Sequence, residues 1–295
     1  MKKTVIDGQQ FSGERALYKV SDLEINNSIF ADGESPLKHS SNIDFENSVF
    51  KWKYPLWHSS NISIKDGAIF DGGRAGIWYT DNIKVNDTLI EAPKEFRRCT
   101  NVSLENVTFT NAQETFWNCN SVELKNVQAT GEYFAMNSND LKIDGLTLSG
   151  NYPFDGCKKV EVRNSKLLSK DSFWNCENVT VYDSYICGEY LAWNSKNVTF
   201  VNCIIESEQG LCYIQNLKLV NCRLLNTNLA FEYSTVEADI TANNLTIKNP
   251  AGGKIKVNQL DELIMDETKI NPEKTLIDCP KIAKKTFEVT DPVII

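Results

Sequence analysis

A repeat of about twenty residues constrains this chain more than any other feature of its sequence. The segment that begins at Asn101 (NVSLENVTF) recurs at Asn178 (NVTVYDSYI) and at Asn197 (NVTFVNCII). Equivalent segments begin 19 to 21 residues apart at Asp22, Asn42, Asn61, Asn82, Asn101, Ser121, Asp140, Lys159, Asn178, Asn197, Asn216 and Thr235. A fixed period over so many copies indicates a solenoid, in which each repeat packs against its neighbours.

Within each repeat the second and fourth residues are apolar, as in Val102 and Leu104. This period of two predicts a strand with one buried face. The sixth residue belongs almost always to the types that tolerate a left-handed backbone: Asn47, Asp66, Asp87, Asn106, Asn126, Gly145, Asn164, Asp183, Asn202 and Asn221. A left-handed residue bends the chain, so we expect a second strand to follow at once. After a variable loop, a third short strand is expected at segments such as 116–119.

Three short strands in each coil of 19–21 residues predict an all-β fold, a single-stranded right-handed parallel β-helix of about 12–14 coils. Leucine-rich and hexapeptide repeats do not match this frame. We expect one domain, with coils over residues 22–254, an N-terminal cap over 1–21 and a C-terminal cap over 255–295. The stretch from Leu260 to Met265 is interpreted as a short amphipathic cap helix.

The bend residues, the long loop and the strand before the next coil resemble those of the pectin-lyase-like right-handed parallel β-helix superfamily, in an uncharacterised bacterial branch. The resemblance covers about residues 20–255. It implies that the sheet after the variable loops forms the floor of a polysaccharide-binding groove. One fold hosts many functions, so the resemblance does not by itself assign chemistry.

Charge and hydrophobicity disfavour some classes of binding partner. The chain has 31 Lys and Arg against 39 Asp and Glu, a net charge of −8, which disfavours nucleic acid or an anionic membrane as the main partner. No apolar run reaches the length of a membrane helix, and Asp7 interrupts any signal-peptide core, so we expect a cytoplasmic protein. The sequence predicts no cofactor and no metal site, and it leaves the oligomeric state open.

The position four residues before each repeat carries five of the six tryptophans: Trp57, Trp78, Trp117, Trp174 and Trp193. Lys38, Arg97, Met136, Asp155, Cys212 and Phe231 occupy the same column in other coils. The preceding column is apolar throughout, so alternation places that column inside and the tryptophan column outside. Exposed indoles can stack on sugar rings, so a ligand groove is favoured over packing beneath loops or a protein interface.

Other candidate groups lie beside this column. We assign substrate binding to the five tryptophans and to Met136, Tyr133, Tyr152, Tyr190 and Glu189. A carboxylate between apolar neighbours is suited to general acid catalysis, which makes Asp155 the candidate acid, with Glu132 or Asp171 as its partner. Lyase chemistry would use Arg97 to neutralise charge.

The nine cysteines form an odd set without any C-x-x-C motif. Several share repeat positions with Ser or Thr, which favours tight interior packing over a disulfide, redox or metal role. Asn118, Asn137, Asn175 and Asn194 form a column that predicts a hydrogen-bonded amide ladder. His39 and His58 share one column, and stacking is favoured over a shared metal ion.

Two hypotheses remain open. The first is a carbohydrate-active enzyme, a hydrolase or a lyase, that acts on an oligosaccharide or polysaccharide along the tryptophan column. The second is a non-catalytic scaffold that binds a glycan or a protein on the same face. A test at Asp155 separates them, because only the enzyme requires this carboxylate for turnover.

Overall fold

The computed structural model describes residues 2–287. The chain divides into two compact units, Met1–Val160 and Glu161–Ile295, and each is described by itself. Both units are parallel β-solenoids in which each strand pairs with the equivalent strand of the next coil. No helix among the described residues is long and apolar enough to span a membrane. A single domain over the whole chain stays a prediction.

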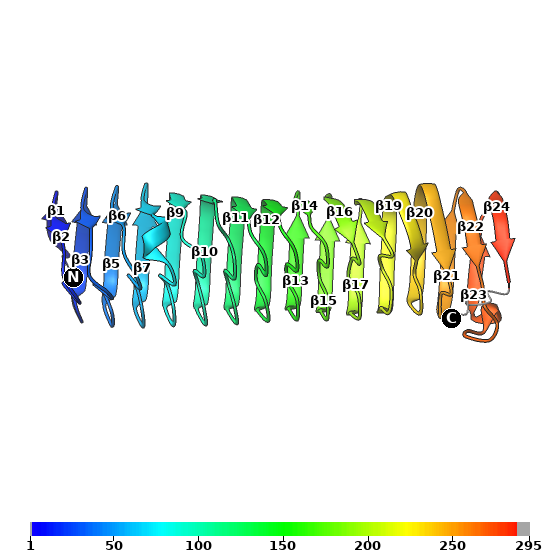
Figure 1. Ribbon diagram of the computed structural model, residues 1–295, viewed down its shortest axis with the longest axis horizontal. Helices are drawn as coiled ribbons and strands as arrows, with labels where there is room; N and C mark the ends of the chain where they lie inside the picture. The colour runs from blue at the N-terminus through cyan, green and yellow to red at the C-terminus, as the bar shows by residue number, and fades with distance from the viewer. Residues whose placement is uncertain (1, 288–295) are drawn as a thin grey trace, which may run out of the picture. The chain divides into compact units, whose positions relative to one another are not determined.

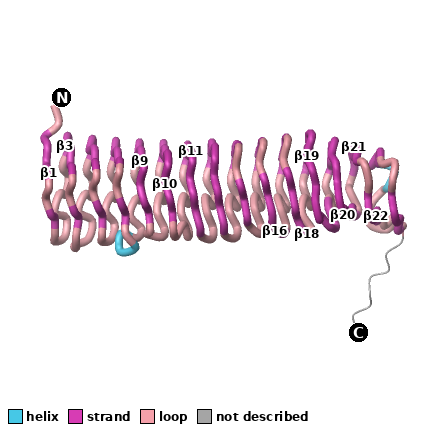
Figure 2. Tube along the Cα trace, turned by 90° about the horizontal axis from the view of Figure 1, so that it is seen from above, coloured by secondary structure: helices cyan, strands magenta, loops and turns pink. Residues whose placement is uncertain are grey.

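Unit 1 contains eight coils, whose first strands stack side by side (Figure 1). Its strands are β1 (Thr4–Asp7), β2 (Gln10–Phe11), β3 (Ser21–Asn26), β4 (Ile29–Phe30), β5 (Ser41–Glu46), β6 (Val49–Phe50), β7 (Ser60–Lys65), β8 (Ala68–Ile69), β9 (Asp81–Ile90), β10 (Thr100–Phe109), β11 (Asn120–Thr130) and β12 (Asn139–Ser149). The short 3-10 helix η1 (Asp71–Gly73) protrudes from the coils (Figure 2). Coiling therefore begins at Thr4, within the segment expected to be a cap.

β13 (Lys158–Arg163) crosses the boundary between the units and begins seven further coils. The other strands of unit 2 are β14 (Lys166–Leu168), β15 (Glu177–Tyr182), β16 (Tyr185–Glu189), β17 (Lys196–Val201), β18 (Ile204–Glu208), β19 (Gln215–Ala230), β20 (Thr235–Lys248), β21 (Gly252–Val257), β22 (Leu260–Ile264), β23 (Thr275–Asp278) and β24 (Ile282–Thr286), with the 3-10 helix η2 at Pro272–Lys274. The expected helix from Leu260 to Met265 is wrong, because β22 pairs with β20 and continues the coils. Residues 288–295 of the expected cap lie outside the described chain.

In the parallel register, each strand residue lies beside the equivalent residue of the next coil. Val102 and Leu104 of β10 lie opposite Val122 and Leu124 of β11, and all four side chains are buried. Deeper in the same unit, the rings of Phe96 and Phe116 stack with centroids 4.8 Å apart. The period of two in the sequence therefore produces a continuous apolar interior, as predicted.

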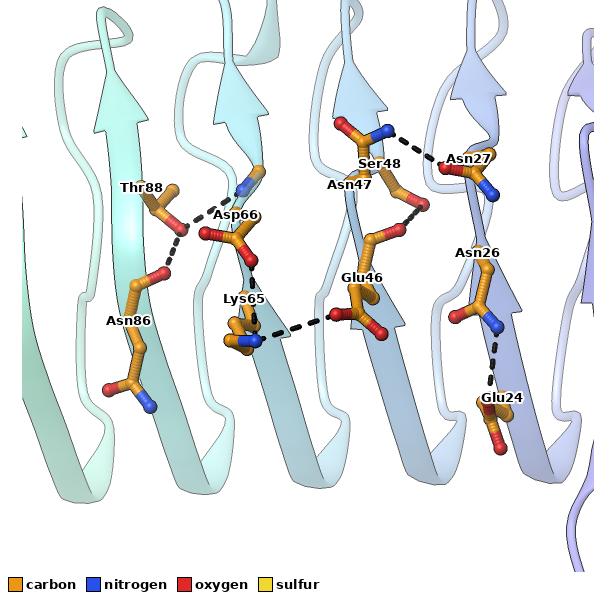
Figure 3. Close-up of polar contacts among 11 residues, drawn as sticks. Glu24, Asn26, Asn27, Glu46, Asn47, Ser48, Lys65, Asp66, Asn86 and Thr88 are labelled. Atoms are coloured by element: carbon orange, nitrogen blue, oxygen red, sulfur yellow. Dashed lines mark hydrogen bonds and ion pairs between the residues drawn. The ribbon is translucent and has the colours of Figure 1, made fainter.

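The sixth residue is left-handed in every repeat except the one that begins at Thr235, where it is Ile240; φ is near +50° at Asn47 and Asp66. Asn and Asp tolerate this conformation, and their side chains reach the next coil. The amide nitrogen of Asn47 donates to Oδ1 of Asn27 at 2.8 Å, and Lys65 lies between Glu46 and Asp66 (Figure 3). The corner is thus fixed by backbone preference and by bonds between coils.

The third segment of each coil differs from the prediction. It is not a regular strand, because alternate residues such as Phe116 and Asn118 have φ near +55°. Backbone bonds still join the coils there, for example from the N–H of Phe116 to the carbonyl of Glu95 at 3.0 Å. Only isolated parallel bridges form in this segment of the described chain, between Trp78 and Arg97 and between Arg97 and Trp117.

The shared column of Ser and Cys residues has a physical explanation. The hydroxyl of Ser59 donates to the carbonyl of Leu37 at 2.9 Å, and the thiol of Cys119 donates to the carbonyl of Phe96 at 3.0 Å. Each position therefore needs a small side chain with one donor, which either residue supplies. All nine cysteines are free thiols, and seven of them are buried.

Candidate functional site

The tryptophan column faces outward in both units, as alternation predicted. The apolar column beside it is fully buried, whereas Trp57, Trp78, Trp117, Trp174 and Trp193 are half-buried. The exposed part of the column ends earlier than expected, because Cys212 and Phe231 are fully buried. Tyr213, which is 40% exposed, takes the outward place instead and stacks on Trp193 with ring centroids 4.9 Å apart.

The polar edge of most indoles is used within the protein. Nε1 of Trp57, Trp78 and Trp117 donates to the carbonyls of Ala75, Lys94 and Tyr133 at 2.6–2.7 Å. Trp174 in unit 2 donates to the carbonyl of Tyr190 at 2.8 Å. Each bond joins the ring to the loop of the next coil. These indoles are therefore held rigidly.

The faces of the indoles are also occupied. Trp57 and Trp78 stack with centroids 5.2 Å apart and planes 7° apart. The ammonium of Lys38 lies 5.8 Å from the Trp57 ring. Trp78 therefore lies between Trp57 and Arg97, and Trp57 lies between Trp78 and the more distant Lys38. Stacking of a sugar on the indole faces of this column stays a prediction.

Arg97 lies between two indoles. Its guanidinium carbon is 4.5 Å from the ring of Trp78 and 4.5 Å from the ring of Trp117. Nη2 also forms an ion pair with Glu114 at 3.0 Å, and Glu114 pairs with Lys94 at 3.2 Å. A cation between two aromatic faces is favourable, particularly when partly desolvated. The guanidinium is therefore held within the protein by two rings and one carboxylate, while its Nε is buried without a hydrogen-bond partner among the described residues. The catalytic role of Arg97 stays a prediction.

A second column runs beside the first, three residues before each repeat. His39 and His58 stack with ring centroids 5.0 Å apart, and His58 stacks on Tyr79 at 4.7 Å. Arg98 continues the row, 5.9 Å from the Tyr79 ring. The predicted histidine stack is confirmed, and burial together with the charge of His39 lowers the pKa of His58. No group of three or more metal-ligating side chains occurs among residues 2–287.

Together the two columns define what we call the aromatic–cationic strip of unit 1. It comprises Tyr18, Lys19, Lys38, His39, Trp57, His58, Trp78, Tyr79, Arg97, Arg98, Trp117 and Asn118. Over six coils, or about 24 Å at one strand spacing per coil, it has four permanent cations and no carboxylate. Lys19, Lys38 and Arg98 have no ion pair in the described chain. This local positive charge contrasts with the net charge of −8.

The candidate catalytic groups are spread over the two units. Asp155 is half-buried in unit 1, and the exposed Glu132 accepts a hydrogen bond from the Asn151 amide at 3.3 Å. Asp171 is buried and belongs to unit 2, whereas Asp155 and Glu132 belong to unit 1. The paired-carboxylate assignment therefore stays a prediction.

The remaining predicted binding residues form two groups. Tyr133 and Tyr152 of unit 1 stack with centroids 4.9 Å apart, and both are half-buried, as is Met136. In unit 2 the ring of Tyr190 meets Trp193 edge to face, and Glu189 pairs with Lys170 at 2.7 Å. Their role in ligand binding stays a prediction.

Two features escaped the sequence interpretation. One is a groove of about 610 Å³ on the outer face of the first strands of unit 1, lined at each coil by the first residue of the repeat. The Asn, Ser and Asp at these positions were the available signal. The other is Glu95, whose carboxyl group is fully buried. Its pKa is raised well above the ordinary value because burial disfavours the charged form.

Comparisons place the chain among known proteins. A family described as "Protein of unknown function (DUF3737)" matches residues 4–278. No curated protein has a matching sequence.

Similar solved structures include the mannuronan C-5 epimerase AlgE6 A-module of Azotobacter vinelandii, 11% identical, with a TM-score of 0.40 and coverage of 98% of this chain and 91% of that one. The tailspike of E. coli bacteriophage HK620, solved with a pentasaccharide, is 9% identical, with a TM-score of 0.33 and coverage of 95% and 72%.

Proposed function

Because the chain belongs to the DUF3737 family, whose description gives no activity, we propose a function from the surface of the protein alone. The protein binds an acidic oligosaccharide along the aromatic–cationic strip of unit 1. The observation that carries this proposal is the composition of the strip, in which four cations lie among aromatic rings and Glu114 pairs with only one of them, Arg97. Such a surface attracts anionic groups and also offers apolar ring edges.

The cations of the strip differ in availability. Arg97 is neutralised by Glu114, whereas Lys19 and Arg98 are exposed and lie against tyrosine rings at 5.2 Å and 5.9 Å. Lys38 is half-buried over Trp57. Partial desolvation of a cation strengthens its attraction for a carboxylate. The ligand therefore carries negative groups spaced along its length.

A carbohydrate fits the strip better than a nucleic acid. The ring faces that would stack on bases are covered in Trp57 and Trp78, so a base finds no open platform. The edges of indole and tyrosine rings still pack against the apolar faces of sugars.

The test is calorimetric titration with a hexamer of galacturonic acid, its methyl ester and a single-stranded oligonucleotide of equal length. We expect the acid hexamer to bind and its affinity to fall as salt rises. Changing Lys38→Gln or Arg98→Gln should lower the affinity roughly fivefold each, about 1 kcal/mol for an exposed charge pair. Lys51→Gln, which removes an exposed cation outside both the strip and the groove described below, is the matched control.

Three results would contradict the proposal: equal binding of the methyl ester, tighter binding of the oligonucleotide, or no effect of either strip variant. Trp57→Ala should unfold part of the strip as well as weaken binding, since Trp57 also donates to Ala75. Trp57→Phe keeps the stack and removes that bond, so it separates packing from recognition.

Catalysis is a further proposal for the same face. Asp155 is half-buried in the column that continues the strip, and it keeps the role of candidate acid. Asp155→Asn should abolish turnover of a bound oligosaccharide while leaving its dissociation constant unchanged. Unchanged turnover in this variant would leave binding as the function.

A further inference from the structure

The groove on the first strands is a second surface with its own chemistry. It has a volume of about 610 Å³ and extends over β5, β7, β9, β10, β11 and β12. This volume lies within the range of ligand sites in proteins, about 300–1,000 Å³. All of its lining residues belong to unit 1.

Strand alternation explains which side chains line the groove. In β9, Asn82 and Lys84 point outward, while Ile83 and Val85 are buried. The first residue of each repeat in unit 1 is left-handed, with φ of +57° at Asn82. It therefore marks a corner of the coil, and its side chain lies at the margin of the groove. The residue two positions later lies on the groove floor.

The margin carries a ladder of amides. Nδ2 of Asn82 donates to Oδ1 of Asn61 at 3.0 Å, and Nδ2 of Asn101 donates to Oδ1 of Asn82 at 2.8 Å. An amide has two N–H donors and two acceptor lone pairs. The ladder uses one of each from Asn82, so one donor and one acceptor remain for a ligand. These amides are exposed and are held in a fixed orientation by their neighbours.

Charge distinguishes the groove from the aromatic–cationic strip. Its lining includes three carboxylates, Asp44, Glu123 and Asp140, and two ammonium groups, Lys84 and Lys142. Lys142 and Glu123 lie 3.9 Å apart. The groove is therefore close to neutral, and an acidic polymer gains no net attraction there.

We propose that this groove binds an extended, uncharged oligosaccharide. Sugar hydroxyls both donate and accept, which matches the donor and acceptor left on each margin amide. Successive coils rise by about 4.8 Å. Four of them in a row present an Asn at the margin, at positions 42, 61, 82 and 101, so a polymer of small repeating units meets an equivalent amide at each of these steps. A peptide is disfavoured, because the strands of the floor are already paired on both sides.

Two pairs of variants test the site within one strand, β10. Asn101→Gly removes a margin amide, and Asn106→Gly removes the equivalent amide at the other corner, which bonds Asp87 at 3.0 Å but does not line the groove. Both residues have φ of +56°, so Gly relieves rather than adds strain. Ser103→Tyr fills the groove floor, and Thr108→Tyr places the same ring on an outward position elsewhere in β10.

The probes are cellohexaose, maltohexaose, xylohexaose and the galacturonic acid hexamer, titrated by calorimetry. We expect at least one neutral hexamer to bind the wild-type protein. Its affinity for Asn101→Gly should be about tenfold lower, which corresponds to the loss of one or two hydrogen bonds. Ser103→Tyr should abolish this binding. Asn106→Gly and Thr108→Tyr should bind the hexamer with the same affinity as the wild-type protein. Melting curves serve as the control that the two variants of each pair are equally folded.

Failure of this inference is distinguishable from failure of the strip proposal. If no neutral hexamer binds, or if binding survives Ser103→Tyr, the groove is not an oligosaccharide site. Loss of acidic hexamer binding in Ser103→Tyr would overturn the separation of the two surfaces. Acidic binding that responds only to Lys38→Gln and Arg98→Gln leaves the strip proposal standing whatever the groove variants do.

Discussion

The buried carboxyl group of Glu95 makes the stability of unit 1 depend on pH. Its side chain is 0% exposed, and Oε1 accepts the N–H of Gly76 at 2.9 Å. Oε2 has no hydrogen-bond partner. A Cβ at position 76 would lie 2.5 Å from Oε2, so glycine makes room for this carboxyl group. Burial raises the pKa of Glu95 well above its ordinary value.

The sign of the effect follows from proton linkage. In the unfolded chain a Glu loses its proton near pH 4.3, whereas folded Glu95 keeps it to higher pH. The stability from Glu95 is complete below the unfolded pKa and is lost as pH rises through the folded pKa. Between these two values the free energy of unfolding falls by about 1.4 kcal/mol per pH unit, the slope for one proton.

Glu95→Gln should remove this slope while keeping the shape of the side chain. The assay is urea unfolding, followed by tryptophan fluorescence, from about pH 5 to about pH 8. The variant should become the more stable protein as pH rises, with the difference growing by about 1.4 kcal/mol per unit inside the window. Thr115→Val, which removes a buried hydroxyl that also lacks a partner, is the control and should parallel the unchanged protein. A constant difference between Glu95→Gln and the unchanged protein would refute the reasoning.

Three further predictions concern packing and titration. Gly150→Ala should lower the free energy of unfolding in urea by more than about 3 kcal/mol, because its Cβ would lie 1.9 Å from the Gly131 carbonyl oxygen. The control Gly8→Ala, which has open space around it, should lower this free energy by about 1 kcal/mol. Equal losses would contradict the clash. Arg97→Ala should lower the free energy of unfolding by about 1–3 kcal/mol and shift the tryptophan emission, because two ring contacts and an ion pair are lost. An unchanged emission spectrum would contradict this prediction. His58 should titrate below the ordinary histidine value in an NMR pH series, and a raised pKa would show that burial and the charge of His39 do not dominate.

Much of the solenoid was predictable because its causes are local. Alternation at positions such as Val102 and Leu104 defines a buried face in any strand. Asn47 and Asp66 indicate a left-handed corner from their residue type alone, and both have the expected φ. The Ser and Cys column was interpreted correctly as tight interior packing.

The candidate site was less predictable because it depends on contacts between coils. The repeat pattern shows that Trp57 and Trp78 share a column, but not whether their rings present faces or edges to solvent. The structure decides this through the indole N–H bonds to Ala75 and Lys94, which turn the rings so that they stack on each other. The same holds at the end of the column, where Cys212 is buried and Tyr213 is exposed.

The sequence by itself determined the coil length, the buried columns and the left-handed corners, since these follow from side-chain period and backbone preference within a few residues. Only the tertiary structure decided which outward groups remain for a ligand. Hydrogen bonds and stacking between adjacent coils use up the faces and N–H groups of the indoles, while the amides of Asn82 and Asn101 keep donors and acceptors at the margin of a groove. That difference arises from the geometry of neighbouring coils, which a single repeat does not contain.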